Sequence, residues 1–219
     1  MHRFTLLLAA AASALLPLAN VSAQDVESQV NQIHFNLTAN PKFTKCIAQY
    51  PNDPNRPPTA TVSVLRGNLN DTLTLTGKWI KPNLQFDLFT VEKSNLLSDG
   101  TADPSFTTFG LAWYQSDVQA SSTGTLATTT VKSILLDQIF GFDADLSNPD
   151  PINTFHVGFW FNNPNDAVAC GFDANSPTPF NGEHKAGPVA MVSVPNAITN
   201  LGPLCTNPDF NTDPISCNP

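Results

Sequence analysis

Apolar and polar residues alternate one by one in several short runs of this chain, and this alternation most constrains its fold. The runs TATVSVLRG, DTLTLTGKWI and LQFDLFTVE all show it. In the second run the two kinds of residue separate onto two faces, with Thr72, Thr74 and Thr76 on one and Leu73, Leu75 and Trp79 on the other. A period of two is that of a β-strand with one buried face, so each run predicts a half-buried strand.

Further runs of the same kind follow toward the carboxyl end. TTFGLAWYQSD, FHVGFWF and PVAMVSV predict strands, and VQAS and TLATTTVKSILL predict the arms of a hairpin around residues 121–124. The chain has 19 prolines, many of them between these runs, and proline interrupts helices. The helix candidates are DVESQVNQIHFNL, whose apolar spacing is ambiguous, and a single turn in PNDAVAC. We expect an all-β fold, an antiparallel β-sandwich of about seven to nine strands with long irregular loops and little helix.

The amino-terminal residues predict export from the cell. A basic start, MHRF, is followed by the apolar run TLLLAAAASALLPLA and by VSA, whose small residues suit signal peptidase. We therefore expect a signal peptide over residues 1–23, a secreted, extracellular product and no transmembrane helix. Two sequons, at Asn36 and Asn70, agree with this route and are candidate glycosylation sites.

Composition limits the partners, and patterning sets the expected boundaries. Loss of residues 1–23 removes one basic residue, Arg3, and no acidic one, so 9 Lys and Arg would face 18 Asp and Glu, a net charge of −9. Such a chain has no basic stripe for phosphate backbones, and we expect neither a nucleic-acid nor a membrane partner.

We expect three parts in the mature chain: an amino-terminal extension packed on the domain (24–58), the sandwich (59–200) and a disulfide-stapled tail (201–219).

Four cysteines predict two disulfides in an oxidising compartment, with three connectivities open. Cys205 and Cys217 enclose TNPDFNTDPIS, a polar stretch that buries little and would gain from a local bridge. This leaves Cys46 to pair with Cys170. Because no Cys-x-x-Cys spacing occurs, we expect a structural rather than a redox role for all four.

The run FHVGFWF predicts a strand whose two faces differ in kind. One face has only apolar side chains, Phe155, Val157, Phe159 and Phe161, and the other has His156, Gly158 and Trp160. TTFGLAWYQ divides similarly, with Phe109, Leu111 and Trp113 on the expected core side and Tyr114 opposite. Glycine weakens a strand and is useful where something approaches closely. We expect the tail, the loop at residues 145–151 or a bound ligand to cover this second face.

Several residues are candidates for a catalytic or metal site. His156 and His184, with Glu183, Asp117 or His34 nearby, offer the nitrogen and oxygen ligands that zinc or copper accept. None of these histidines has a His-x-His or His-Glu-x-x-His spacing, so we predict no metal and no cofactor. Asp87, Asp117 and Glu183 are candidate glycosidase carboxylates, whose separation a sequence does not reveal. No Gly-x-Ser-x-Gly motif marks a serine nucleophile.

A binding role fits the same residues better than catalysis. Aromatic rings with polar neighbours hold sugars and other uncharged polar polymers. The candidate ligand-binding residues are Tyr114, Trp160, His156, Asn162, Glu183 and His184. We expect a secreted, non-catalytic surface or cell-wall-associated module whose partner is an extracellular polysaccharide or cell-wall component. The alternatives are a metal-dependent or glycan-acting secreted enzyme using His156, His184 and nearby carboxylates, and a secreted factor acting on another organism.

If His156 is not a ligand, it needs a hydrogen-bonding partner. Asp117, Glu183 and a loop carbonyl are the natural acceptors for a partly covered ring nitrogen. We expect a carboxylate, because FNGEHKAG supplies Glu183. Such a partner would raise the pKa of His156, whereas an apolar cover would lower it.

Four blocks of the chain, FGLAWYQSD, TFHVGFWFNNPNDA, TPFNGEHKAG and PNLQFDLF, carry a resemblance. They resemble an uncharacterised family of small secreted proteins of filamentous fungi and actinobacteria over roughly residues 60–194. The resemblance implies a shared extracellular β-fold and supplies no catalytic residue. The segment before Thr59 and the tail after Asn200 fall outside the pattern.

Overall fold

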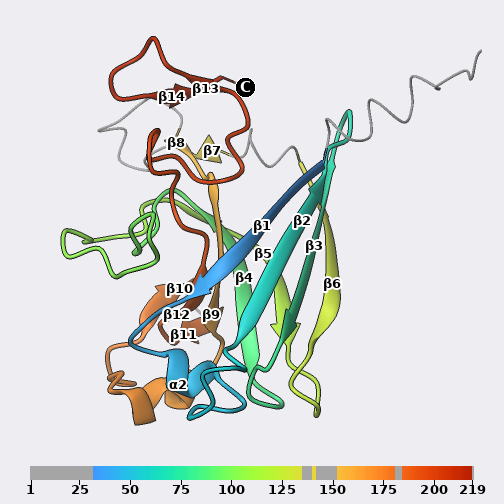
Figure 1. Ribbon diagram of the computed structural model, residues 1–219, viewed down its shortest axis with the longest axis vertical. Helices are drawn as coiled ribbons and strands as arrows, with labels where there is room; N and C mark the ends of the chain where they lie inside the picture. Colours follow the sequence, from blue (N-terminus) through green and yellow to red (C-terminus); the bar gives the residue numbers. More distant parts are fainter. Residues whose placement is uncertain (1–31, 135–139, 142–151, 181–183, 219) are drawn as a thin grey trace, which may run out of the picture. The chain divides into compact units, whose positions relative to one another are not determined.

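The structure is a computed structural model, which describes residues 32–134, 140–141, 152–180 and 184–218. Eight strands form one antiparallel sheet in the order β5-β4-β9-β12-β1-β2-β3-β6 (Figure 1). Their bounds are β1 (Gln32–Ala39), β2 (Thr59–Leu65), β3 (Asp71–Lys78), β4 (Gln85–Val91), β5 (Ala112–Gln119), β6 (Leu126–Ser133), β9 (His156–Phe161) and β12 (Val189–Val192). The predicted all-β, antiparallel class with little helix is confirmed.

Strand β1 connects the two halves of the sheet. Its residues 32–37 pair with β2, whereas Thr38 and Ala39 pair with β12. At the other end of the order, a tight turn with a bridge between Ala120 and Leu126 joins β5 to β6, and these two edge strands contact each other. The sheet therefore almost closes on itself, with β1 as the strand that changes sides.

The main core lies inside this nearly closed sheet and follows the period-two pattern. Leu73 and Leu75 of β3 are fully buried, whereas Thr76 is exposed. The Phe86 ring of β4 lies 4.8 Å from the Phe159 ring of β9, between centroids. Trp79 departs from the predicted face, because its φ of 58° takes the chain out of the strand after Lys78. Alternation therefore predicts the core of β3 but not its end.

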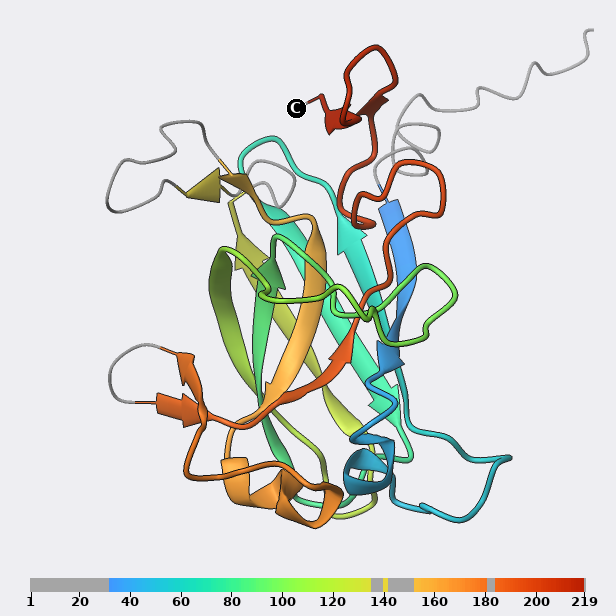
Figure 2. The same cartoon turned by 90° about the vertical axis from the view of Figure 1, so that its left-hand side faces the viewer.

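The outer face of β4, β9 and β12 carries a second buried cluster. It comprises Phe89, Val91, Leu96, Trp160, Ala186, Val189 and Val192, with Phe109 and Ala112 packed against it. The connection between β4 and β5, residues 92–111, supplies part of this cluster and crosses in front of β9 and β12 (Figure 2). Both faces of β9 are therefore buried, and the cover that the structure shows is this connection. The 145–151 loop, also expected as a cover, lies outside the described residues.

Short elements complete the described part of the chain. Helical turns occur at α2 (Thr44–Ile47) and η2 (Pro164–Cys170), and two-stranded pairs are formed by β7 (Phe140–Gly141) with β8 (Ile152–Asn153), β10 (Thr178–Phe180) with β11 (His184–Ala186), and β13 (Pro208–Asp209) with β14 (Ser216–Cys217). Asn163 caps η2 by accepting a hydrogen bond from the Asn165 backbone at 3.0 Å, as the predicted turn requires. The other helix candidate, DVESQVNQIHFNL, is a strand from Gln32 onward.

The disulfides join Cys46 to Cys170 and Cys205 to Cys217, the pairing that the spacing favoured. The first links α2 to the end of η2 and the second closes the tail around β13 and β14. Two disulfides indicate that the chain folds in an oxidising environment. Within the described residues, no helix has the length and apolar character needed to cross a membrane.

The segments outside the expected 59–200 domain are joined to it closely. β1, from the stretch expected as an extension, lies within the sheet because its inward side chains, among them Leu37, pack in the main core. At the other end Leu204 is fully buried, and its backbone N–H donates to the Phe155 carbonyl at 3.1 Å. Arg66 donates to the Leu204 carbonyl at 3.0 Å. The predicted signal peptide, residues 1–23, lies outside the described residues.

Candidate ligand-binding site

The register of β4, β5 and β9 brings four polar side chains to one outer surface. Asp87 lies opposite Asp117 of β5 on one side and opposite Trp160 of β9 on the other. Tyr114 lies opposite Phe89. The pairing shifts between Leu88 and Phe89, so Gln115 is an extra residue in β5. Because of this bulge, Tyr114 and Asp117, three residues apart, point to the same face.

Tyr114 is held in place but remains accessible. Its hydroxyl donates to Oδ1 of Asp117 at 2.8 Å, and its ring meets the Phe89 ring edge-on with the centroids 5.5 Å apart. Burial raises the pKa of Tyr114 to about 12, and the hydrogen bond to Asp117 and the negative charges of Asp117 and Asp87 act in the same direction. The side chain is 43% exposed. A neutral phenol ring in a fixed orientation therefore faces solvent.

Asp87 and Asn162 lie beside this ring. Nδ2 of Asn162 donates to Oδ1 of Asp87 at 2.8 Å, and Asp87 is buried. Asn162 also borders a surface hollow of about 520 Å³, which is lined by Gln85, Phe86, Asp117, Val118, Gln119 and Asn162. Amide and carboxylate groups thus surround a hollow large enough for a small polar molecule. They offer the donors and acceptors that sugar hydroxyls require.

The two aromatic rings among the candidate ligand-binding residues, those of Tyr114 and Trp160, are not exposed together on this surface. Trp160 is fully buried, with its ring edge-on to Phe89 and Phe109 at centroid distances of 5.5 and 4.9 Å. Trp160 is therefore a packing residue here. Trp113 was expected in the core and is instead 45% exposed, opposite Thr90 and on the other face from Tyr114. Tyr114 is thus the exposed ring of this surface.

His156 occupies a different environment from the one expected. Its side chain is 2% exposed, and Nδ1 lies 3.1 Å from the carbonyl oxygen and 3.0 Å from Oγ of Ser193. Burial lowers the pKa of His156 to about 4, although the Ser193 backbone contact opposes this shift. The expected carboxylate partner and raised pKa are therefore wrong. The partner is the chain just after β12, and desolvation outweighs the hydrogen bond.

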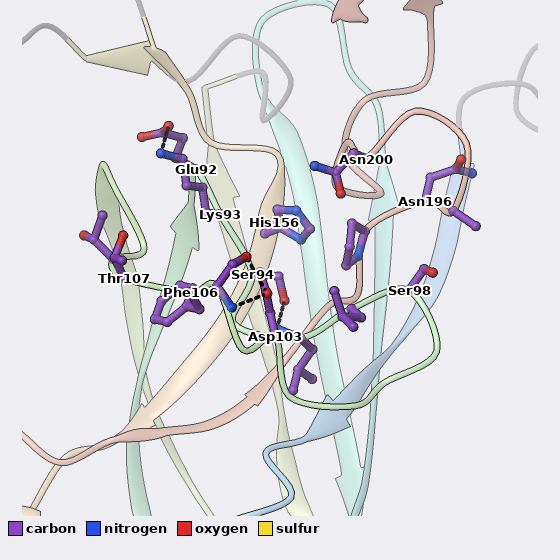
Figure 3. A pocket seen from close by; sticks show the side chains of 16 residues that line it. Glu92, Lys93, Ser94, Ser98, Asp103, Phe106, Thr107, His156, Asn196 and Asn200 are labelled. Carbon is purple, nitrogen blue, oxygen red and sulfur yellow. Dashed lines mark hydrogen bonds and ion pairs between the residues drawn. The ribbon is translucent and has the colours of Figure 1, made fainter. Parts of the chain in front are cut away.

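His156 also lines a cavity of about 360 Å³ beneath the connection between β4 and β5. Its ring lies between Glu92, Lys93, Phe106 and Thr107 on one side and Ser98, Asn196 and Asn200 on the other (Figure 3). Glu92, Lys93 and Asp103 are the charged residues in this lining. Sequence patterns did not indicate this cavity, because it forms between segments that lie far apart in the chain.

Two further candidates come from the FNGEHKAG stretch. Glu183 lies outside the described residues, and His184 belongs to β11. His34, Asn36 and Asn70 are exposed. In the described part of the chain, no group of three or more His, Cys, Asp or Glu side chains is placed to hold a metal ion.

Two features of this surface were only partly foreseen. Asp87 and Asp117 were candidate carboxylates, but their position opposite each other depends on strand pairing. One signal was present in LQFDLF, where Asp87 interrupts an apolar run that forms a buried strand. A buried carboxylate requires a hydrogen-bonding partner, and Asn162 is one. Gln85 and Gln119, which line the hollow, had no distinguishing pattern.

Comparisons of the chain with protein-family models, with curated proteins and with solved structures find no match.

Proposed function

We propose that this protein is a secreted, non-catalytic extracellular module that binds a polysaccharide or another cell-wall component through the outer face of β5. The observation that carries the proposal is the exposed ring of Tyr114, oriented by Asp117 beside the hollow that Asn162 lines. The C–H face of a sugar ring packs on an aromatic ring, while its hydroxyls bond to carboxylates and amides. An uncharged polymer suits this surface, because its hydroxyl groups can donate to Asp117 and its sugar rings can pack on the neutral ring of Tyr114.

The extracellular location is supported by chemistry elsewhere in the chain. Two disulfides persist in oxidising compartments, and the amino-terminal run has the pattern of a signal peptide. Both sequon asparagines, Asn36 and Asn70, are exposed, as glycosylation requires. Mass spectrometry of the exported protein tests both points. It should begin at Gln24 and carry glycan on at least one asparagine when made in a eukaryotic host.

One observation favours a second candidate, a glycan-acting enzyme. Asp87 and Asp117 are a cross-strand pair, and glycosidases use two carboxylates that flank the scissile bond. Both carboxylates are already hydrogen-bonded, Asp87 to Asn162 and Asp117 to Tyr114. These hydrogen bonds suit carboxylates that orient the Tyr114 ring and the Asn162 amide, and binding is therefore the main proposal.

A sedimentation assay with insoluble cellulose, chitin and β-1,3-glucan tests the binding function. The protein should bind at least one of them, and Tyr114→Ala should weaken that binding roughly two- to thirteenfold, since an aromatic contact is worth roughly 0.5–1.5 kcal/mol. Tyr114→Phe should retain part of the affinity, because the ring remains while the hydrogen bond to Asp117 is lost. Tyr50→Ala is the matched control, because Tyr50 packs against Arg56 and belongs neither to β5 nor to the lining of the hollow.

Two outcomes would contradict the proposal. One is that the wild-type protein sediments with none of the three polymers. The other is that Tyr114→Ala binds as strongly as Tyr50→Ala. The same incubations should be assayed for new reducing ends. If these appear with the wild-type protein and disappear in Asp117→Asn, the enzyme replaces the binding module.

A further inference from the structure

The cavity under the β4–β5 connection is separate from the β5 surface. Tyr114 is not among the residues that line this cavity. Phe89, which lies opposite Tyr114, packs edge-on against the buried ring of Trp160, and Phe109 packs against the same ring. The volume of about 360 Å³ is within the range of small-molecule sites. A ligand here would not contact Tyr114.

His156 presents a hydrogen-bond acceptor to this cavity. The Ser193 carbonyl oxygen can only accept, so the tautomer with the proton on Nδ1 is the one that lets His156 donate to it at 3.1 Å. The Ser193 hydroxyl oxygen, which accepts from the Val157 backbone N–H at 3.1 Å, has a second lone pair and can accept from the same ring N–H. In this tautomer Nε2 carries the lone pair, and His156 is one of the residues that line the cavity (Figure 3). Burial keeps the imidazole neutral, which preserves this acceptor at neutral pH.

Two carboxylates add further acceptors to the lining. Oδ1 of Asp103 accepts from the backbone N–H and the hydroxyl of Ser105 at 2.8 and 2.6 Å, and these bonds lower the pKa of Asp103. Oε2 of Glu92 accepts from the Leu111 backbone at 3.2 Å, and Oε1 lies 3.2 Å from Nζ of Lys93. Both carboxylates are thus held in place by local bonds. With one lysine against two carboxylates, the lining disfavours an anionic ligand.

Asn196 supplies a donor to this cavity, and Phe106 and Pro195 supply apolar surface. Oδ1 of Asn196 accepts from the backbone N–H groups of Ile198 and Thr199 at 2.9 and 3.1 Å, which leaves Nδ2 as the free end of a fixed amide. Phe106 and Pro195 contribute apolar surface to the same cavity. Acceptors, an amide donor and a few apolar side chains match a molecule with several hydroxyls on a carbon skeleton.

We propose that this cavity binds a small, neutral polyhydroxylated ligand, a monosaccharide or a sugar alcohol, with one ligand hydroxyl donating to Nε2 of His156. This site is independent of the polymer surface on β5. It would let the protein hold a single sugar whether or not it binds a polysaccharide.

Imidazole NMR signals report directly on this contact. The ¹⁵N-labelled protein should be titrated at millimolar concentrations with glucose, N-acetylglucosamine and mannitol. At least one should shift the Nε2 signal of His156 in a saturable way and leave that of the exposed His34 unchanged. Inorganic phosphate should leave the His156 signal unchanged, because the lining is acidic overall.

Two variants locate the ligand. Ala197→Trp places a bulky ring at an exposed position of the cavity lining, and Ser98→Trp does so from the connection between β4 and β5. Each should weaken the titrated shift at least tenfold, a change equal to about 1.4 kcal/mol. Ala127→Trp, at an exposed position of β6, is the matched control and should bind like the wild type. Tyr114→Ala should also leave the His156 shifts intact, which separates this proposal from the polymer proposal.

Several results would overturn the proposal. One is that none of the three compounds moves the His156 signal of the wild-type protein. A second is a shift that persists at full affinity in whichever of Ala197→Trp and Ser98→Trp gives a folded spectrum. A third is that phosphate, and not a sugar, saturates the His156 signal.

Discussion

Acidification should destabilise this protein through His156, and replacing that residue by glutamine should remove the effect. The pKa of His156 in the folded protein is about 4, below its ordinary value of 6.5, because burial disfavours the charged ring. The folded state therefore binds a proton less readily than the unfolded chain. The stability that depends on a neutral His156 is complete above pH 6.5 and is lost as the pH falls toward 4.

The magnitude follows from the two pKa values. One pKa unit corresponds to 1.36 kcal/mol, and at pH 5 the unfolded chain is almost fully protonated at this histidine while the folded protein is not. Between pH 7 and pH 5 the wild type should lose about 2 kcal/mol through this residue. Glutamine has no titrating group. His156→Gln should therefore be less stable than the wild type at pH 7, by about 1–2 kcal/mol for the altered packing and hydrogen bond to Ser193, and the difference should shrink or reverse at pH 5.

Urea unfolding of both proteins at pH 7 and pH 5 measures this change. His34→Gln makes the same chemical change at an exposed position of β1 and gives its cost outside the core. Comparing the variant with the wild type at each pH cancels the titration of carboxylates elsewhere. A difference that stays constant between the two pH values would refute the reasoning. A difference that widens at pH 5 would show that His156 is charged and paired with a carboxylate after all.

Two further predictions concern the bridges and the start of the tail. The bond between Cys46 and Cys170 spans 124 residues and that between Cys205 and Cys217 spans 12, so replacing each pair by serine should cost on the order of 5 and 3 kcal/mol respectively by loop entropy. Denaturant unfolding of the two double variants should give this order, and equal losses would argue against it. A Cβ at Gly202 would collide with the Phe155 carbonyl, so Gly202→Ala should lower the free energy of unfolding by about 1–3 kcal/mol. An unchanged melting curve would show that the tail does not press against β9.

Local pattern was enough to predict most strands. A strand exposes alternate residues to opposite faces, so alternation in DTLTLTG marks β3 without knowledge of its neighbours. The same rule placed Phe159 in the core and Trp160 on the other face. It failed for Phe109, which lies in a connection before β5 rather than in a strand, and for Trp113, which is at the exposed start of an edge strand.

The sequence predicted some residues of the candidate surface but not their arrangement. Tyr114 and Asn162 were identified from residue type, but the bulge at Gln115 decides that Tyr114 and Asp117 share a face. A bulge depends on how two strands pair, and neither strand alone encodes its position. The cross-strand pairing of Asp87 with Asp117 follows from the same register.

The sequence by itself determined the class of fold and favoured the disulfide pairing. The period of a strand and the number of residues between two cysteines can both be read along the chain, without knowledge of which segments pack together. The state of His156 was decided only by the tertiary structure. Its partner, Ser193, is 37 residues away, and the 92–108 segment that helps line the cavity beside it precedes it by 48 to 64 residues. Burial depends on what packs over a residue, and it sets the dielectric environment that decides whether a histidine is charged.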